Sequence, residues 1–164
     1  MVLLAGIYYP EGYNMKESPQ TLRLEQMLRS SKLVAGGFMG TDSRSLAEIV
    51  DADTSELARL GYTIEQITSR MQTITNTAKA GFESWVRIDD KRQAAVIEAR
   101  GFTICPWPHS GHCAKRVTTV ERLDSGESIH FSDLNIHMIA QHGFFEGKGS
   151  PFRIEPERLI DLIF

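Results

Sequence analysis

The chain has 164 residues, of which 41% are hydrophobic and 24% are charged. That composition is typical of a globular protein and excludes a low-complexity or disordered chain. Its 18 Lys and Arg residues against 21 Asp and Glu residues give a formal charge of −3, which supplies no basic surface for the phosphate backbone of a nucleic acid. We therefore expect a single domain over residues 1–164 and disfavour nucleic acid as a partner.

The opening segment, residues 1–9, is apolar and predicts a strand. It lacks the positively charged flank of a secretion signal and is too short to cross a bilayer. No other stretch approaches the roughly 18 consecutive apolar residues of a membrane-spanning helix, so we expect no membrane segment. Two cysteines close to a group of histidines, without a secretion signal, indicate a reducing compartment, and we expect the protein to be cytoplasmic.

Capping patterns predict three helices in the first half of the chain. The first runs over 18–31, with Pro at its first position, and a short strand is expected after it at 32–35. A capping box at 45–48 begins the second helix, which the polar run 51–56 breaks or caps anew. A second capping box at 63–66 begins the third helix. Its apolar stripe consists of Ile67, Met71, Ile74 and Ala78.

The second half of the chain is expected to be rich in β-structure. Residues 91–100 fit either a helix or a strand, and we favour the strand because β-rich sequence follows. The other expected elements are a strand at 84–88, a strand at 116–122, a turn at 124–126, a return strand at 127–131, a helix from Ser132 or Asp133 to Gly143, and a terminal helix from Pro156.

These elements predict an α+β fold. A helical N-terminal half, mainly helical over 1–100, packs with a C-terminal β-hairpin and helix module that binds metal, over 101–143. A loop and the terminal helix follow over 144–164.

Both cysteines and all five histidines fall within residues 105–142. Thiolates and imidazoles are the side chains that bind zinc and related metals best at neutral pH. The four residues that we expect to bind the metal ion are Cys105, Cys113, His137 and His142. Two thiolates before a hairpin and two imidazoles on the following helix resemble, in layout, finger-like zinc ribbons, although the layout names no family.

The spacings within this set agree with the layout only in part. Four residues separate His137 from His142, within the range of about three to five in known zinc sites. On an ideal helix the two side chains point about 140° apart, so the last turn has to loosen before Gly143. The seven residues between Cys105 and Cys113 exceed the usual spacing, and a disulfide between the two cysteines stays open as an alternative.

Three further candidate ligands remain, His109, His112 and His130. A closed structural site needs four ligands, so a surplus leaves room for an open coordination position or for a general base beside the metal. The ordinary interpretation of the first two is that of exposed loop residues, and that of His130 is a structural histidine at a strand end.

These sequence features are compatible with three functions. The first is a small cytosolic protein whose zinc ion is mainly structural and which binds a protein or small-molecule partner. The second is a metal-dependent hydrolase or nuclease that uses His109 or His112, with Asn135 beside the metal-binding histidines. The third is a DNA-binding regulator with a helix-turn-helix centred on 63–80, which the net charge disfavours.

Overall fold

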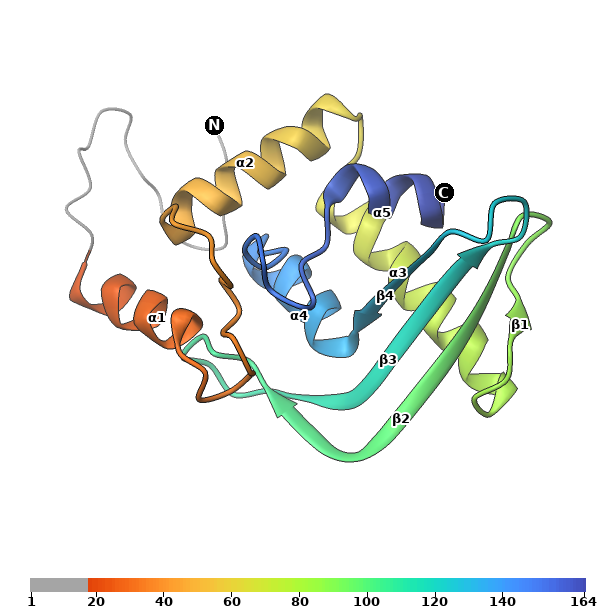
Figure 1. The fold of residues 1–164 in the computed structure, drawn as a ribbon, viewed down its shortest axis with the longest axis horizontal. Helices are drawn as coiled ribbons and strands as arrows, with labels where there is room; N and C mark the ends of the chain where they lie inside the picture. Colours follow the sequence, from red (N-terminus) through yellow and green to blue (C-terminus); the bar gives the residue numbers. More distant parts are fainter. Residues whose placement is uncertain (1–17) are drawn as a thin grey trace.

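Five α-helices and a four-stranded antiparallel sheet form the computed structural model, which describes residues 18–164 (Figure 1). The helices are α1 (Pro19–Arg29), α2 (Leu46–Arg59), α3 (Ile64–Ala78), α4 (Asp133–His142) and α5 (Pro156–Ile163), with a 3-10 turn at Lys79–Gly81. The strands are β1 (Val86–Arg87), β2 (Arg92–Ile104), β3 (His112–Arg122) and β4 (Ser128–Ser132), in that order across the sheet. The α+β class predicted from the sequence is confirmed. The strand expected at 1–9 lies outside the described residues.

Side-chain caps begin the first three helices where the sequence predicts them. The hydroxyl of Ser18 accepts from the backbone N–H of Thr21, and complete capping boxes begin α2 and α3. The expected break in α2 at 51–56 is wrong. Thr54 donates its hydroxyl to the Val50 carbonyl within the helix, and Asp53 is buried and paired with Arg153, so these polar side chains are satisfied without a break in the helix.

The strand expected at 32–35 is also wrong, because the chain turns back onto the end of α1. The N–H of Gly37 donates to the Val34 carbonyl, and the N–H groups of Phe38 and Met39 both donate to the carbonyl of Leu28. The bonds to Leu28 satisfy a carbonyl group near the C-terminus of α1. The segment therefore pairs with the end of the helix and with itself, and it does not pair with a strand. The strand expected at 84–88 is confined to the two residues of β1.

Residues 92–100 belong to a strand, β2, as the sequence analysis favours for 91–100. In β2 they pair with β3 from Arg92 opposite Arg122 to Ile104 opposite His112, with a bulge between Ala99 and Phe102. At this bulge the ribbon of β2 and β3 bends, and its far end extends toward α1 (Figure 1). β2 thus runs across the boundary predicted at residue 100, and the division of the chain into domains stays a prediction.

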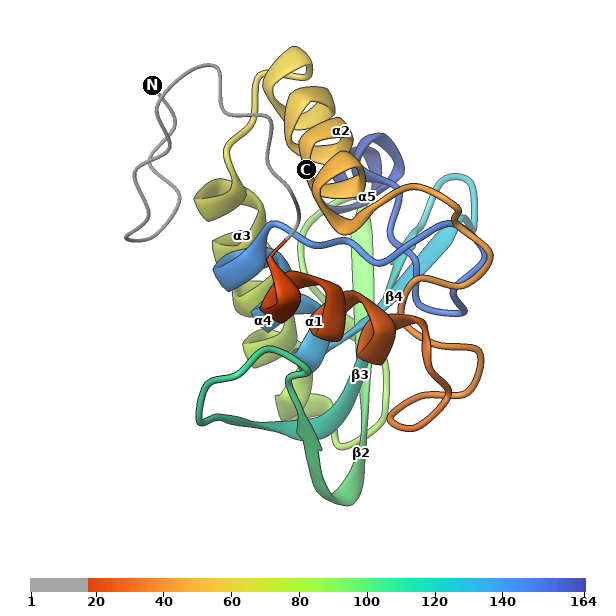
Figure 2. The same ribbon diagram turned by 90° about the vertical axis from the view of Figure 1, so that its left-hand side faces the viewer.

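Two apolar clusters fill the interior. The sheet core comprises Leu57, Ile67, Met71, Ile74, Ala78, Ala94, Val96, Val120, Phe131, Ile136, Ile139, Phe145, Ile154, Leu159 and Ile163. The loop-side core comprises Leu28, Phe38, Met39, Leu46, Ile49, Cys105, Leu134, Met138 and Phe144. The stripe predicted on α3 lies entirely in the sheet core. Figure 2, which looks onto α1, shows the loop that joins β2 to β3 beside α1 and the end of α4.

α4 contributes to both clusters. Ile136 and Ile139 lie in the sheet core, and Leu134 and Met138 lie in the loop-side core. All four side chains are buried, so the helix is fixed from two sides.

The segment between α4 and α5 is tied down by polar contacts. Arg153 forms a buried ion pair with Asp53 of α2 and also donates to the carbonyl oxygen of Glu146. The N–H of Lys148 donates to the carboxylate of Asp42, and the N–H of Gly147 donates to the Phe38 carbonyl. A long connection without regular structure is thereby held against α2 and the turn after α1.

Glu146 is the buried acid of this segment, with only 3% of its surface exposed and a positive φ of 67°. Its carboxylate accepts from Nδ2 of Asn135 at 3.0 Å and from the hydroxyl of Ser150. Burial raises the pKa of Glu146 to about 7, even though these hydrogen bonds and the charge of Arg153 act in the opposite direction.

This pKa predicts a pH-dependent stability that Glu146→Gln should remove. A carboxyl whose folded-state pKa lies above its unfolded value stabilises the protein at low pH, and this stability is lost as pH rises through about 7. The wild type should therefore lose on the order of 3 kcal/mol between about pH 4.5 and about pH 7.5 relative to the variant.

Urea unfolding of both proteins across that range measures the difference. Glu83→Gln is the matched control, because Glu83 also has a positive φ but is exposed. Parallel stability curves for the wild type and Glu146→Gln would contradict the assignment.

Candidate metal centre

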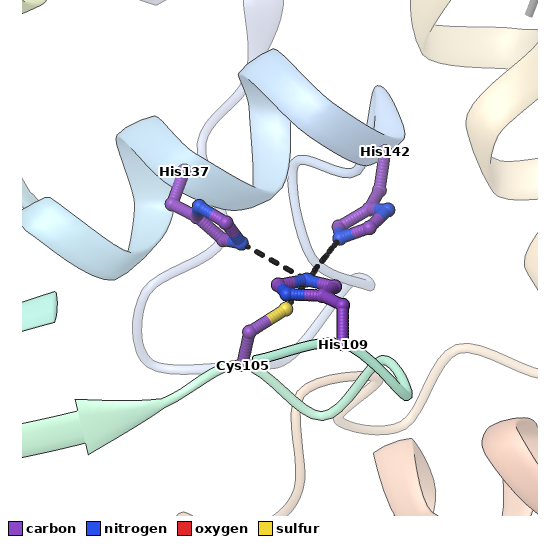
Figure 3. A group of neighbouring side chains, drawn as sticks. All are labelled: Cys105, His109, His137 and His142. Carbon is purple, nitrogen blue, oxygen red and sulfur yellow. Dashed lines mark hydrogen bonds between the residues drawn. The ribbon is translucent and has the colours of Figure 1, made fainter. Parts of the chain in front are cut away.

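Four side chains bring one ligand atom each to the same place: Cys105, His109, His137 and His142. All four ligand atoms lie within 4.8 Å of one another (Figure 3). The first two residues come from the loop that joins β2 to β3, and the other two come from α4. The cluster thus spans two segments that are distant in sequence, and a metal ion bound there would link them.

Three of the six distances between the ligand atoms match those around a tetrahedral ion. Nε2 of His109 lies 3.2 Å from Nε2 of His137 and 3.2 Å from Nε2 of His142, and Sγ of Cys105 lies 3.5 Å from Nε2 of His142. Tetrahedral zinc, with bonds of about 2.0 Å to nitrogen and about 2.3 Å to sulfur, separates two nitrogens by about 3.3 Å and a sulfur from a nitrogen by about 3.5 Å. These three separations therefore match those around such an ion, and the other three are no longer than 4.8 Å.

The hydrogen-bonding options of the three rings also favour a cation. Nδ1 of His109 lies 3.2 Å from the carbonyl oxygen of Ser110, which assigns the ring proton to Nδ1 and leaves a lone pair on Nε2. That lone pair faces two further ring nitrogens, those of His137 and His142. A single ion accepts all three lone pairs at once, whereas hydrogen bonds among three neutral rings cannot satisfy every pair.

Burial keeps the imidazoles in the form that binds metal. It lowers the pKa of His142 to about 4, with smaller contributions from the nearby His109 and His137, and it lowers the pKa of His137 for the same reason. Burial raises the pKa of the Cys105 thiol. Without a metal ion, burial thus favours the protonated thiol. A bound cation would favour the thiolate, because a metal ion displaces the proton of a coordinating thiol.

Local sequence places each ring. Ser132 and Asn135 form the capping box that begins α4, and Gly143, with a φ of 62°, ends the helix directly after His142. The indole of Trp107 stacks on the ring of His142 with centroids 4.0 Å apart and planes 3° from parallel. This stacking fixes the orientation of the His142 ring. The sequence analysis did not predict the contact, because Trp107 belongs to no recognised motif.

Three of the four expected ligands, Cys105, His137 and His142, belong to the cluster. The fourth member is His109, one of the further candidates, and Cys113 is not a member. Cys113 lies within β3 opposite Thr103 and packs against the loop-side core. Strand pairing sets the position of Cys113. His109 lies in the loop before β3, outside the strand pairing, and its ring reaches α4.

The remaining candidates lie outside the cluster. His112 is exposed and packs edge-on against Phe102, and His130 is exposed and packs edge-on against Phe152. Both cysteines are free thiols, so the disulfide considered above is not formed in this structure. Asn135, considered for a hydrolase site, is fully buried and bound to Glu146.

Comparisons with protein-family models, curated proteins and solved structures found no match for this chain. Within residues 18–164, no helix is both long enough and apolar enough to cross a bilayer.

The two cysteines provide the sharpest test of the ligand set. Cys105→Ser should weaken metal binding at least about 100-fold, because it removes a ligand, whereas Cys113→Ser should change it by less than about threefold. His109→Ala and its matched control His112→Ala should differ in the same way. Competition between the protein and a chromophoric chelator for zinc measures all four affinities. Equal losses in the two cysteine variants would contradict the assignment.

Proposed function

We propose that this chain is a zinc-binding protein whose ion is mainly structural, and that the surface fixed by the ion binds a protein or small-molecule partner. The observation that supports this most is the convergence of one sulfur and three ring nitrogens within 4.8 Å of one another, with three of their separations matching those of tetrahedral zinc.

The donor set supports zinc over other common metals. Magnesium and calcium prefer oxygen ligands, and copper(II) and nickel(II) favour square-planar arrangements. One thiolate and three imidazoles around a tetrahedral centre suit zinc, which has no geometric preference of its own.

The number of protein ligands supports a structural role. Catalytic zinc sites generally have three protein ligands and one open position for water or substrate, whereas structural sites have four. Cys105, His109, His137 and His142 would complete the coordination, so no position would remain for a reacting molecule. The second function considered, a hydrolase or nuclease, gains no support from the geometry, because Asn135 is occupied in the interior.

The place of the cluster in the fold supports the same role. Between β2 and β3 the chain forms no regular structure, and its one internal backbone hydrogen bond runs from the N–H of His109 to the carbonyl of Trp107. An ion shared with α4 would therefore supply the constraint that backbone pairing does not. We also propose that the protein is located in the cytoplasm, because a reducing compartment keeps Cys105 available as a thiolate ligand.

Elemental analysis of protein purified without a histidine tag tests this proposal. We expect about one zinc ion per chain. Removal of the ion with a chelator should lower the melting temperature and weaken the near-ultraviolet circular dichroism of Trp107, and added zinc should restore both. Protein that contains no zinc and whose melting temperature does not respond to added zinc would refute the proposal.

A further inference from the structure

A cavity of about 400 Å³ lies beside the metal centre. Four segments surround it: the turn after α1, the far end of the β2–β3 ribbon, the junction of β4 and α4, and the connection between α4 and α5. Figure 1 shows the first two of these segments crossing each other. Thr103 and Ile104, which line the cavity, directly precede Cys105 in the chain, so the cavity wall and the metal centre share a backbone segment.

The cavity is mostly apolar, and part of its wall is unprotected. Phe102 is 67% exposed, Ile104 is 59% exposed and Leu33 is 46% exposed, although all three line the same hollow. Neighbouring apolar side chains that remain exposed around a concave surface are typical of a binding site. The volume lies within the range of about 300–1,000 Å³ for sites that hold small molecules.

The charges around the cavity are mainly positive. Lys32, Lys115 and Arg116 line it. Arg116 is neutralised by Glu98 and Asp133, whereas neither lysine forms an ion pair within residues 18–164. The remaining charge around an apolar hollow is therefore that of two exposed ammonium groups.

Among residues 18–164, Glu146 is the one acidic residue that lines the cavity, and its carboxylate already has hydrogen-bond partners. Its two carboxylate oxygens accept from Asn135 and Ser150, and only 3% of its surface is exposed. Because both oxygens already accept hydrogen bonds, Glu146 offers no free acceptor to a cationic ligand.

We propose that this cavity binds an amphipathic organic anion of the medium-chain carboxylate class. The hydrocarbon chain would lie against Phe102 and Ile104, and the carboxylate would lie between Lys32 and Lys115. The inference rests on the proposed function in one respect: the zinc ion would hold the loop that continues from this wall of the cavity. It specifies where the proposed small-molecule partner binds and to which chemical class that partner belongs.

Calorimetric titration of the zinc-loaded protein with octanoate tests the inference. We expect saturable binding of one octanoate per chain, weaker binding of octanol, and no binding of octylammonium. Affinity should rise about fourfold for each methylene added from hexanoate to octanoate, as expected for burial of the chain.

Charge reversal tests the site on the protein. Lys32→Glu combined with Lys115→Glu should lower octanoate affinity at least tenfold, and Phe102→Ser should lower it by a similar factor. Lys91→Glu is the matched control, because Lys91 is equally exposed and does not line the cavity. All four substituted positions are exposed, so each variant should fold. A melting curve of each variant verifies this.

The outcomes separate this inference from the proposed function, provided that zinc is measured in the same samples. Full zinc content without octanoate binding refutes the cavity proposal alone. Octanoate binding by protein that takes up no zinc refutes the structural metal and leaves the cavity site standing. Octanol binding as tight as octanoate, with no effect of the lysine changes, identifies an apolar contact surface and overturns the anion site.

Discussion

The packing of α4 between the two apolar clusters is the constraint on which the rest of the structure depends. Leu134 and Met138 face the loop-side core, while Ile136 and Ile139 face the sheet core. A helix buried on two sides has one face left for other contacts, and on α4 that face carries His137 and His142. The two imidazoles are therefore held by the hydrophobic interior and need little rearrangement to bind an ion.

The opposite half of the site depends on the sheet. The bulge between Ala99 and Phe102 bends the ribbon of β2 and β3, and the bend brings the loop after Ile104 to the end of α4. Cys105 is buried in the loop-side core, so packing places the thiol as well. His109 is exposed and comes from a loop with little backbone pairing, and it is the ligand whose position would depend most on the ion.

Features that depend on neighbours in sequence could be predicted, and features that depend on distant contacts could not. The start of α3 follows from Thr63 and Gln66, three residues apart, and the end of α4 follows from Gly143. The continuity of α2 through Asp53 depends on an arginine 100 residues away. Likewise, the sequence places all the candidate ligands within residues 105–142, but it does not show that strand pairing keeps Cys113 in β3 while His109 joins the other three residues of the cluster.

The central claim is that one thiolate and three imidazoles hold a single zinc ion. X-ray absorption at the zinc edge tests it most directly, because sulfur and nitrogen ligands lie at different distances from the metal. The account predicts one sulfur at about 2.3 Å and three nitrogens at about 2.0 Å, with the scattering pattern of imidazole rings. Two sulfurs, as in the set that includes Cys113, or a shell made up largely of oxygen would contradict it.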